Sequence, residues 1–342
     1  MKAIIYDDVN KYSLKKDLEE PKINNQLNVK IKVLYCGICG SDIHKLLFEK
    51  PNEDYVKTKV LGHEITGVVV EKMENVSKIQ VGDIVVIEPL LYCNNCRMCK
   101  KGYIQFCENI KSIGKDFQGG FAEYIVANEQ QLYKINKNVD TKIATLSDPY
   151  AVAMHIVKMV QEKKDKKRIA VIGDGIVGMA CAELLHKENE IVVFGKHNNR
   201  INILKKINVK YEDIKNIDGY LEYFDVVIEA VGGRQAKTLY DAINISHKKG
   251  NIFVAGVYDN NFKFDMSLRN SFYKELSIIG CNSFEKEGEI SDFELALKFL
   301  SDDSIIANDL ISKIYDITEF NEAIDYIKNR RINECIKIMI KM

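Results

Sequence analysis

The segment KKRIAVIGDGIVGMACAELL, residues 166–185, decides the fold of the second half of the chain. A short apolar stretch with β-branched residues leads directly into Gly173-x-Gly175-x-x-Gly178, and a helical pattern follows. In this context the first glycine can make a tight turn, the second lets the backbone approach a pyrophosphate, and the third lets a helix pack on a strand. The helix N-terminus then faces the phosphates. We therefore predict a dinucleotide-binding unit here.

Further apolar stretches follow this segment at regular intervals, with helical stretches between several of them. The stretches are EIVVFG (190–195), FDVVIEAVG (224–232), GNIFVAGV (250–257) and ELSIIG (275–280). Alternation of this kind predicts an α/β fold with a parallel, doubly wound sheet.

The end of the second strand indicates which dinucleotide is bound. Sheets that bind NAD usually place Asp or Glu there, about twenty residues beyond the glycines, to hold the ribose 2′-hydroxyl. No acid occurs between Ile191 and Arg200, whereas Lys196, His197 and Arg200 could meet a 2′-phosphate. We predict a preference for NADP(H), with NAD(H) possible; the alternative is that these bases form a solvated turn. The predicted cofactor-binding residues are Gly173, Gly175, Ile176, Val177, Gly178, Gly195, Lys196, Arg200, Val231 and Gly256.

Four cysteines in the first half have the spacing C-x2-C-x2-C-x7-C. They are Cys93, Cys96, Cys99 and Cys107. Thiolates so closely spaced can surround one tetrahedral metal ion, and four of them leave no open coordination position. Disulfides or four unrelated thiols are the alternatives, but neither explains such regular crowding. We predict a structural zinc ion.

A second group of metal-binding residue types lies upstream, in CGICGSDIH (36–44) and LGHE (61–64). Three protein ligands and one exchangeable position let zinc act as a Lewis acid. Cys39 and His63 are the first two predicted ligands. The third is Glu64 or Asp148, and the sequence leaves this choice open; Glu64 also suits a buried structural carboxylate.

Together these motifs resemble zinc-containing medium-chain dehydrogenases of the alcohol dehydrogenase superfamily, over nearly the whole chain. The pattern is most similar to the polyol branch, which includes sorbitol, threonine and galactitol-phosphate dehydrogenases. Within the second half, GDGIVG, VFGK and EAVGGR resemble NADPH-dependent ribulose-5-phosphate reductases. The motifs that carry the family resemblance are Cys39-Gly40-Ser41-Asp42-x-His44, Gly62-His63-Glu64, the four cysteines, GGFAEY (119–124) and the glycine fingerprint.

The resemblance implies two domains. A GroES-like β-barrel catalytic domain would comprise residues 1–149 and 285–342, and a Rossmann domain residues 150–284. The short, glycine-interrupted β-rich segments of the first half suit a barrel. The polyol branch keeps Glu-Pro where this chain has Asp148-Pro149. The shorter aspartate would reach the metal only through water.

The resemblance also implies roles beside the metal. Asp42 would accept a hydrogen bond from His63 and fix which imidazole nitrogen faces the metal, although it could simply cap a helix. Ser41 would pass the hydroxyl proton of the substrate, and His44 could complete the relay, unless a carboxylate and water do so. The alternative for Ser41 is a turn hydroxyl bonded to the backbone. Cys36 and Cys39 could form a redox pair, but the family pattern uses only the second.

The predicted activity is interconversion of a secondary alcohol of a polyol, favoured as an alditol phosphate, and its ketone. Alternatives are an NAD-dependent dehydrogenase of L-threonine or a small diol, a zinc-free quinone reductase, and a non-catalytic dinucleotide-binding protein. Lys45, Lys57, Lys59 and Arg269 are available cations for a substrate phosphate, although each also suits a surface charge.

The charge and composition of the chain limit the kinds of partner that we expect. The 342 residues include 49 basic and 49 acidic side chains, so the net charge predicts neither a nucleic-acid nor a membrane-surface partner. No long apolar stretch suggests a membrane span, and MKAIIYDDVN lacks a signal-peptide pattern. Nine cysteines, partly used for metal, are typical of a reducing cytoplasm. The resemblance implies a homodimer or homotetramer built across the strand near 276–280.

Overall fold

The computed structural model of the protein describes residues 1–342 except 50–58, 137–138, 162–165, 234, 260–261 and 267, and the side chains of residues 330 and 331. The chain divides into two compact units. The first comprises residues 1–148, 285–303 and 310–342, and the second comprises residues 149–284 and 304–309. The division thus assigns residues 304–309 to the second unit, whereas the sequence analysis placed all of 285–342 in the first.

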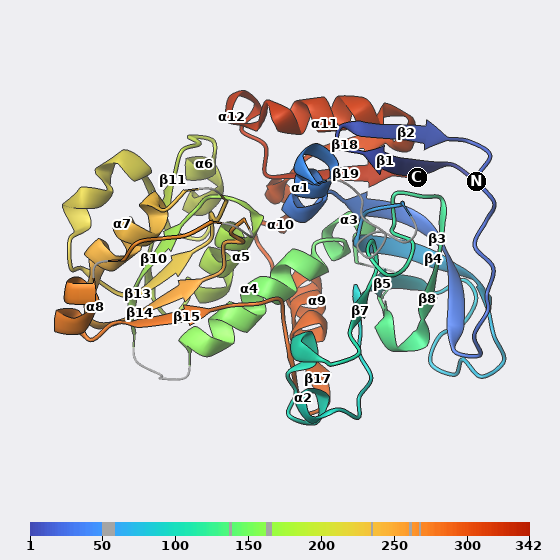
Figure 1. The fold of residues 1–342 in the computed structure, drawn as a ribbon, viewed down its shortest axis with the longest axis horizontal. Helices are drawn as coiled ribbons and strands as arrows, with labels where there is room; N and C mark the ends of the chain where they lie inside the picture. Colours follow the sequence, from blue (N-terminus) through green and yellow to red (C-terminus); the bar gives the residue numbers. More distant parts are fainter. Residues whose placement is uncertain (50–58, 137–138, 162–165, 234, 260–261, 267) are drawn as a thin grey trace. The chain divides into compact units, whose positions relative to one another are not determined.

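The first unit is built on a mixed sheet of seven strands (Figure 1). Its central strand β3 pairs with β4 along one edge and with both β8 and β19 along the other. Most neighbours are antiparallel, but β18 and β19 are parallel. The strands are β3 (Asn28–Gly37), β4 (Glu64–Lys72), β5 (Ile84–Ile87), β8 (Tyr124–Asn128), β9 (Leu132–Lys134), β18 (Ile311–Asp316) and β19 (Lys337–Lys341).

Strand β19 brings the end of the chain to the middle of this sheet. Its residues Met339, Ile340 and Lys341 pair with Gly37, Cys36 and Tyr35 of β3. In Figure 1 the red C-terminal strands accordingly lie beside the blue N-terminal ones. The strand is buried at four of its five residues, which include one lysine, Lys337. This pairing places a late segment of the chain next to the motif around Cys39.

Shorter elements complete the first unit. Alternating buried residues along β3 pack into one hydrophobic core with strands β1 and β4, because successive side chains of a strand point to opposite faces. Other elements of this unit include β1 (Ala3–Asp8), β2 (Lys11–Lys15), β6 (Leu90–Leu91), β7 (Lys111–Ser112), α1 (Gly40–Phe48), α2 (Arg97–Lys100), α9 (Asp292–Asp302) and α11 (Phe320–Lys328).

The second unit contains a parallel sheet of six strands in the order β12-β11-β10-β13-β14-β15. Its central strands are buried runs of Ile, Val and Ala, as expected for parallel strands covered on both faces. The α/β class and the doubly wound sheet are therefore confirmed. The strands are β10 (Arg168–Ile172), β11 (Glu190–Gly195), β12 (Lys210–Asp213), β13 (Phe224–Glu229), β14 (Ser246–Val254) and β15 (Ser277–Gly280).

Helices connect the parallel strands, because a parallel pair needs a crossover connection. Strand β12 was not among the predicted strands, since KYED offers little apolar signal at an edge of the sheet. The helices are α4 (Ser147–Val160), which begins in the first unit, α5 (Ile176–Leu185), α6 (Arg200–Lys205), α7 (Lys237–Ile245) and α8 (Leu268–Lys274). Among the described residues, no helix has the length and apolar character needed to cross a membrane.

Candidate active site and metal centres

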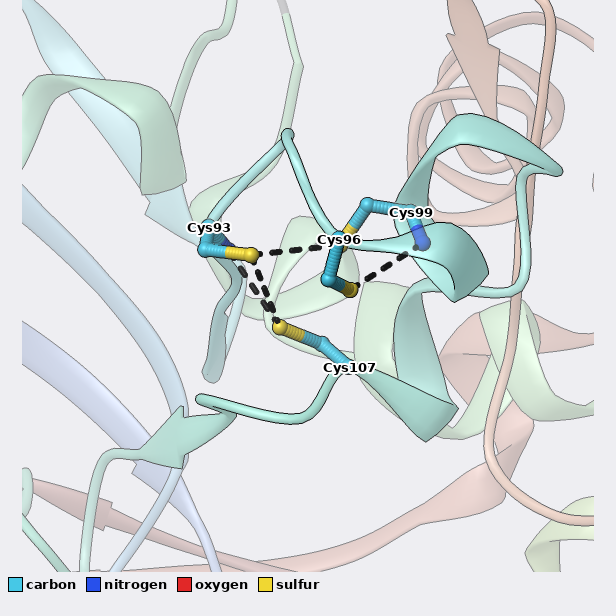
Figure 2. Close-up of side chains that lie close together, drawn as sticks. All are labelled: Cys93, Cys96, Cys99 and Cys107. Atoms are coloured by element: carbon cyan, nitrogen blue, oxygen red, sulfur yellow. Dashed lines mark hydrogen bonds between the residues drawn. The ribbon is translucent and has the colours of Figure 1, made fainter.

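The four cysteines of the C-x2-C-x2-C-x7-C motif converge in the loop between β6 and β7 (Figure 2). Their sulfur atoms all lie within 4.8 Å of one another. The Sγ atoms of Cys93 and Cys107 are 3.5 Å apart, and those of Cys93 and Cys99 are 4.0 Å apart. Zinc–thiolate bonds of about 2.3 Å in a tetrahedron place sulfur atoms about 3.8 Å apart. The group therefore has the donor chemistry and spacing of a closed four-thiolate site.

Backbone N–H groups in this loop stabilise the thiolates of Cys93 and Cys96, whereas burial raises the pKa of Cys99. Backbone N–H groups of Asn95 and Cys96 lower the pKa of Cys93 to about 6. Helix α2 begins after Cys96, whose Sγ accepts the N–H of Cys99 and whose pKa is lowered by this contact. All four cysteines are free thiols rather than disulfides. Since metal ligands must be deprotonated, these contacts prepare the loop for a cation.

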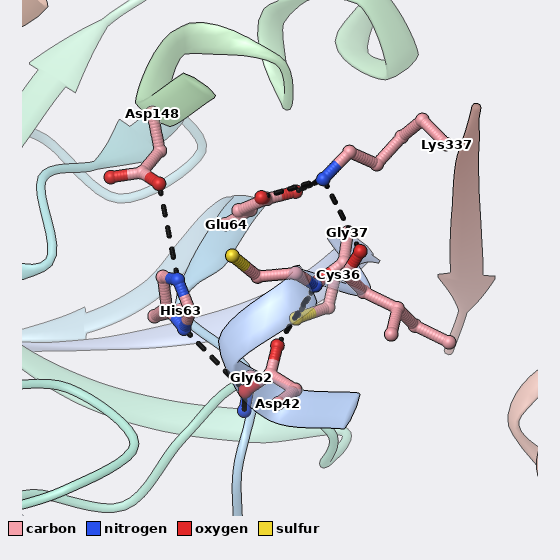
Figure 3. A network of polar contacts seen from close by, with 10 residues as sticks. Cys36, Gly37, Asp42, Gly62, His63, Glu64, Asp148 and Lys337 are labelled. Atoms are coloured by element: carbon pink, nitrogen blue, oxygen red, sulfur yellow. Dashed lines mark hydrogen bonds and ion pairs between the residues drawn. The ribbon is translucent and has the colours of Figure 1, made fainter. Parts of the chain in front are cut away.

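A second compact group of possible ligands consists of Cys39, His63 and Glu64, whose ligand atoms also lie within 4.8 Å of one another. Figure 3 shows His63 and Glu64 in the surrounding network of polar contacts. Cys39 directly precedes α1, and Glu64 is the first residue of β4. A thiolate, an imidazole and a carboxylate are donors that zinc accepts. The structure thus brings together the two motifs that the sequence analysis linked, and the residues present fit the metal.

The imidazole of His63 lies between two carboxylates. Its Nδ1 is 3.5 Å from Oδ1 of Asp42, and its Nε2 is 3.9 Å from Oδ2 of Asp148. Asp42 also caps α1, because its Oδ2 accepts the N–H of Cys39 at 3.0 Å. Burial opposes ionisation of Asp42, but His63 and the Cys39 N–H outweigh it and lower the pKa of Asp42. Asp42 can therefore both cap α1 and orient the ring of His63.

The carboxylate of Asp148 has a different environment. Burial raises the pKa of Asp148 to about 6, and the nearby negative charge of Glu64 acts in the same direction. A carboxylate that is costly to ionise at a buried position gains from a neighbouring cation. Asp148 therefore stays a candidate for the third ligand position beside Glu64.

Lys337 is a residue of this site that the sequence analysis missed. Its ammonium donates to Oε1 and Oε2 of Glu64 at 2.7 and 2.8 Å and to the carbonyl oxygen of Ile38 at 3.2 Å. A Cβ on Gly37 would lie 2.0 Å from Oε2 of Glu64, so only glycine leaves room for this carboxylate. The signal in the sequence was a lysine within the apolar strand pattern KIMIK.

Helix α1 carries Ser41 and His44. Ser41 is exposed and His44 is half-buried, and residues three apart lie on one face of a helix. The Nδ1 of His44 lies 2.8 Å from Oε1 of Glu49. This contact orients the ring and favours a proton on Nδ1, which leaves the lone pair on Nε2.

The glycine loop after β10 has the three geometries that a dinucleotide loop needs. Gly173 has a φ of +117°, Gly175 has open space where a Cβ would be, and a Cβ on Gly178 would lie 2.0 Å from the carbonyl oxygen of Gly173. Helix α5 begins at Ile176, followed by Val177, so their N–H groups belong to its unsatisfied first turn. This helix start can receive a phosphate group.

The end of β11 differs from the expectation based on sequence. Within residues 191–200 there is no acid, but the carboxylate of Asp174, from the glycine loop, reaches the turn that follows Gly195. Lys196 is exposed and His197 is half-buried. Arg200 is only 1% exposed, and its Nε donates to the carbonyl oxygen of Asp174 at 3.0 Å. Arg200, the first residue of α6, is therefore a buried residue that holds the glycine loop through Asp174. Its guanidinium is not a surface cation.

Two further predicted cofactor residues follow the ends of β13 and β14. Val231 is 48% exposed, and its N–H donates to Oε1 of the buried Glu229 at 3.1 Å. Gly256 is close to the opposite loop, since a Cβ there would lie 2.3 Å from the backbone nitrogen of Gly232. Both residues thus lie at the carboxyl edge of the sheet, where α/β sheets bind ligands.

Three of the four candidate cations for a substrate phosphate lie in the part of the chain that the structure describes. Lys59 lies 3.2 Å from a carboxylate oxygen of Asp7, and Arg269 lies over the ring of Tyr273. Lys45 is half-buried on α1. Lys57 lies outside the residues that the structure describes.

Comparisons with known proteins agree with this architecture. The alcohol dehydrogenase GroES-like domain matches residues 25–137, and the glucose dehydrogenase C-terminus matches residues 144–341. A D-arabinitol dehydrogenase of Uromyces fabae is 31% identical, over 100% of this chain and 97% of its own length. The chain therefore belongs to the zinc-containing medium-chain dehydrogenase family, in its polyol dehydrogenase branch. The predicted family resemblance and its GroES-like and Rossmann folds are confirmed.

Two further relatives show the range of the family. A D-arabitol-phosphate dehydrogenase of Enterococcus avium is 30% identical over 95% of this chain and 92% of its own length. The structure of galactitol-1-phosphate dehydrogenase from Escherichia coli superposes with a TM-score of 0.85 at 20% identity, covering 100% of both chains, and shows the shared fold alone. The protein is thus an oxidoreductase that acts on an alcohol and its ketone.

Proposed function

We propose that this protein interconverts a secondary alcohol of a polyol phosphate and the corresponding ketose phosphate, with a catalytic and a structural zinc ion and NADP(H). The observation that carries the proposal is the compact group of Cys39, His63 and Glu64 in a chain that also has a dinucleotide loop. A sensor or a purely structural protein has no need for a thiolate and an imidazole that converge beside carboxylates. This argues against the non-catalytic alternative.

Cys39 and His63 would hold the catalytic zinc with Glu64 or Asp148, and Cys93, Cys96, Cys99 and Cys107 would hold the structural one. Zinc supplies Lewis acidity at the reacting oxygen, and the nicotinamide carries the hydride. Asp42 contacts Nδ1 of His63, which leaves Nε2 as the ring nitrogen available to the metal. This is the same nitrogen that approaches Asp148.

Ser41 and His44 form the proposed proton path. During oxidation the hydroxyl proton of the substrate passes to Oγ of Ser41 while the Ser41 proton moves on toward Nε2 of His44. The contact between Nδ1 of His44 and Glu49 supports this direction, since it holds the ring with its lone pair on Nε2. During reduction the protons move in the opposite sense.

A phosphorylated substrate is supported by two of the similar proteins, which are named for D-arabitol phosphate and galactitol 1-phosphate. NADP(H) is supported by Lys196, an exposed cation directly after β11, and by the lack of an acid in residues 191–200. L-Threonine and small diols are the alternative substrates, and NAD(H) is the alternative cofactor.

The test combines metal analysis with a substrate panel. We expect two zinc ions per chain, and a kcat/KM at least tenfold higher for arabitol or galactitol phosphates with NADP⁺ than for the free polyols. The panel includes L-threonine and 2,3-butanediol with both NADP⁺ and NAD⁺. Fastest oxidation of threonine with NAD⁺ would replace the proposal with its alternative. Full activity of protein stripped of metal would exclude the zinc mechanism.

The oligomeric state and the cellular location of the protein are further predictions. The edge strand β15 exposes Ile278 at 43%, which supports pairing of two copies across this edge. Light scattering that detects only monomers would exclude a homodimer or homotetramer. A cytoplasmic location and the absence of nucleic-acid partners are proposed on the balanced charge and the free cysteines.

A further inference from the structure

The carboxylate of Asp174 lies against the turn that follows β11, although Asp174 itself belongs to the loop after β10. Its Oδ2 accepts the backbone N–H groups of Lys196 and His197, both at 3.0 Å. The ring Nδ1 of His197 lies 2.9 Å from the same oxygen and 3.0 Å from Oδ1. One buried carboxylate thus contacts two of the three residues that were predicted to meet a 2′-phosphate, Lys196 and His197.

Gly195 makes this approach possible. A Cβ at this position would lie 2.2 Å from Oδ2 of Asp174 and 2.4 Å from its Cγ. Any larger residue at the end of β11 would therefore push the carboxylate away. The position that carries an acid in many NAD-binding sheets is here a glycine. The carboxylate at this turn belongs instead to Asp174, in the loop between β10 and α5.

Tyr211 on the neighbouring strand β12 completes the arrangement. Its hydroxyl donates to Oδ2 of Asp174 at 3.2 Å and accepts the N–H of His197 at 2.8 Å. With Lys196, His197 and Tyr211 the carboxylate receives four donors, all of which contact Oδ2, and the ring of His197 also contacts Oδ1. Asp174 is only 7% exposed. A buried carboxylate with these contacts holds the turn in place.

We propose that Asp174 is a positioning residue for cofactor selectivity. Its carboxylate fixes the turn from Gly195 to His197, so that Lys196 and the ring of His197 meet the 2′-phosphate of NADP(H). The proposal rests on the proposed use of NADP(H). Because the contact with Asp174 engages Nδ1 of His197, Nε2 is the ring nitrogen left to face the phosphate.

The experiment measures dissociation constants of NADPH and NADH by titration of the purified full-length protein, without turnover. The quantity of interest is the selectivity ratio, Kd for NADH divided by Kd for NADPH. Asp174→Asn keeps the shape of the side chain but replaces one acceptor oxygen by a donor. We expect the ratio to fall at least fivefold in Asp174→Asn, through weaker binding of NADPH. Lys196→Ala should lower it in the same direction.

Two further variants keep the test interpretable. Tyr211→Phe removes a single donor and should lower the ratio by about twofold even if Asp174→Asn folds poorly. Asp213→Asn, a carboxylate at the end of β12 that caps the following turn, is the matched control and should leave the ratio unchanged. General damage to the unit would weaken both cofactors equally and would not move the ratio.

The outcomes separate this inference from the proposed function. An unchanged ratio in both Asp174→Asn and Tyr211→Phe overturns the positioning role, and a rise caused by weaker NADH binding would show that Asp174 accepts the ribose hydroxyl instead. A wild-type ratio below one would reject NADP(H) preference, whatever the variants do.

Discussion

The ammonium of Lys337 donates to both carboxylate oxygens of Glu64, at 2.7 and 2.8 Å, and neither side chain is more than 2% exposed. The two residues are 273 positions apart and meet because β19 pairs with β3. Burial alone would lower the pKa of Lys337, but the adjacent Glu64 raises it above its ordinary value. The pair therefore ties the last strand of the chain to the candidate metal site.

Replacement of Lys337 by Met should lower the free energy of unfolding by about 3–5 kcal/mol, because a buried carboxylate loses its partner. Urea denaturation of the metal-free protein measures this difference. Lys341→Met, at an exposed position of the same strand, is the control and should change stability by less than about 0.5 kcal/mol. The double variant Lys337→Met/Glu64→Gln should lose less free energy of unfolding than the two single variants lose together. Additive losses would mean that the pair contributes little beyond its separate side chains.

Cys96→Ser should remove one of the two expected zinc ions and lower the melting temperature, since a closed thiolate site contributes folding energy when metal binds. Elemental analysis by mass spectrometry gives the zinc content per chain. Cys281→Ser, a free cysteine in the second unit, is the matched control and should retain both ions. Retention of two zinc ions by Cys96→Ser would contradict a structural site in this loop.

Ser41→Ala should lower kcat by about 10²-fold or more with little change in KM, because a positioned proton-transfer group acts in the transition state. Steady-state kinetics with the best polyol substrate measures both constants. Ser41→Thr keeps a hydroxyl and should retain much of the rate. Equal turnover of the alanine variant and the wild type would remove Ser41 from the proton path.

Burial raises the pKa of Glu88 to about 8, although the hydroxyl of Tyr133 donates to its Oε2 at 2.7 Å and partly opposes the shift. The folded protein then holds a proton that the unfolded chain, with an ordinary value of 4.5, releases. Stability from this group is present at low pH and is lost as the pH rises from about 4.5 to 8, at up to about 1.4 kcal/mol per pH unit.

Glu88→Gln should remove this contribution to the pH dependence, so that the variant becomes more stable relative to the wild type as the pH rises. Urea denaturation at pH 5.5, 7 and 8 provides the comparison. Glu71→Gln, at an exposed position of β4, is the control. Parallel curves for Glu88→Gln and the wild type would show that Glu88 is ionised throughout.

The sequence by itself predicted the main features that depend on short-range spacing, although not the edge strand β12. The cysteines of the C-x2-C-x2-C-x7-C motif converge because the loop that joins them is short, and Gly173, Gly175 and Gly178 act within one turn between a strand and a helix. The doubly wound sheet was predictable because the buried parallel strands are continuous apolar runs. The family followed from the order of these motifs along the chain.

Only the tertiary structure decided the contacts made across long separations. Lys337 reaches Glu64 through the pairing of β19 with β3, and Asp174 reaches the end of β11 because β10 and β11 are neighbours and Gly195 leaves space. The same packing turns Arg200 inward, where its position in the sequence indicated a surface base. Spacing along the chain determines which residues can meet locally, but the charge around a buried carboxylate depends on side chains that only folding brings together.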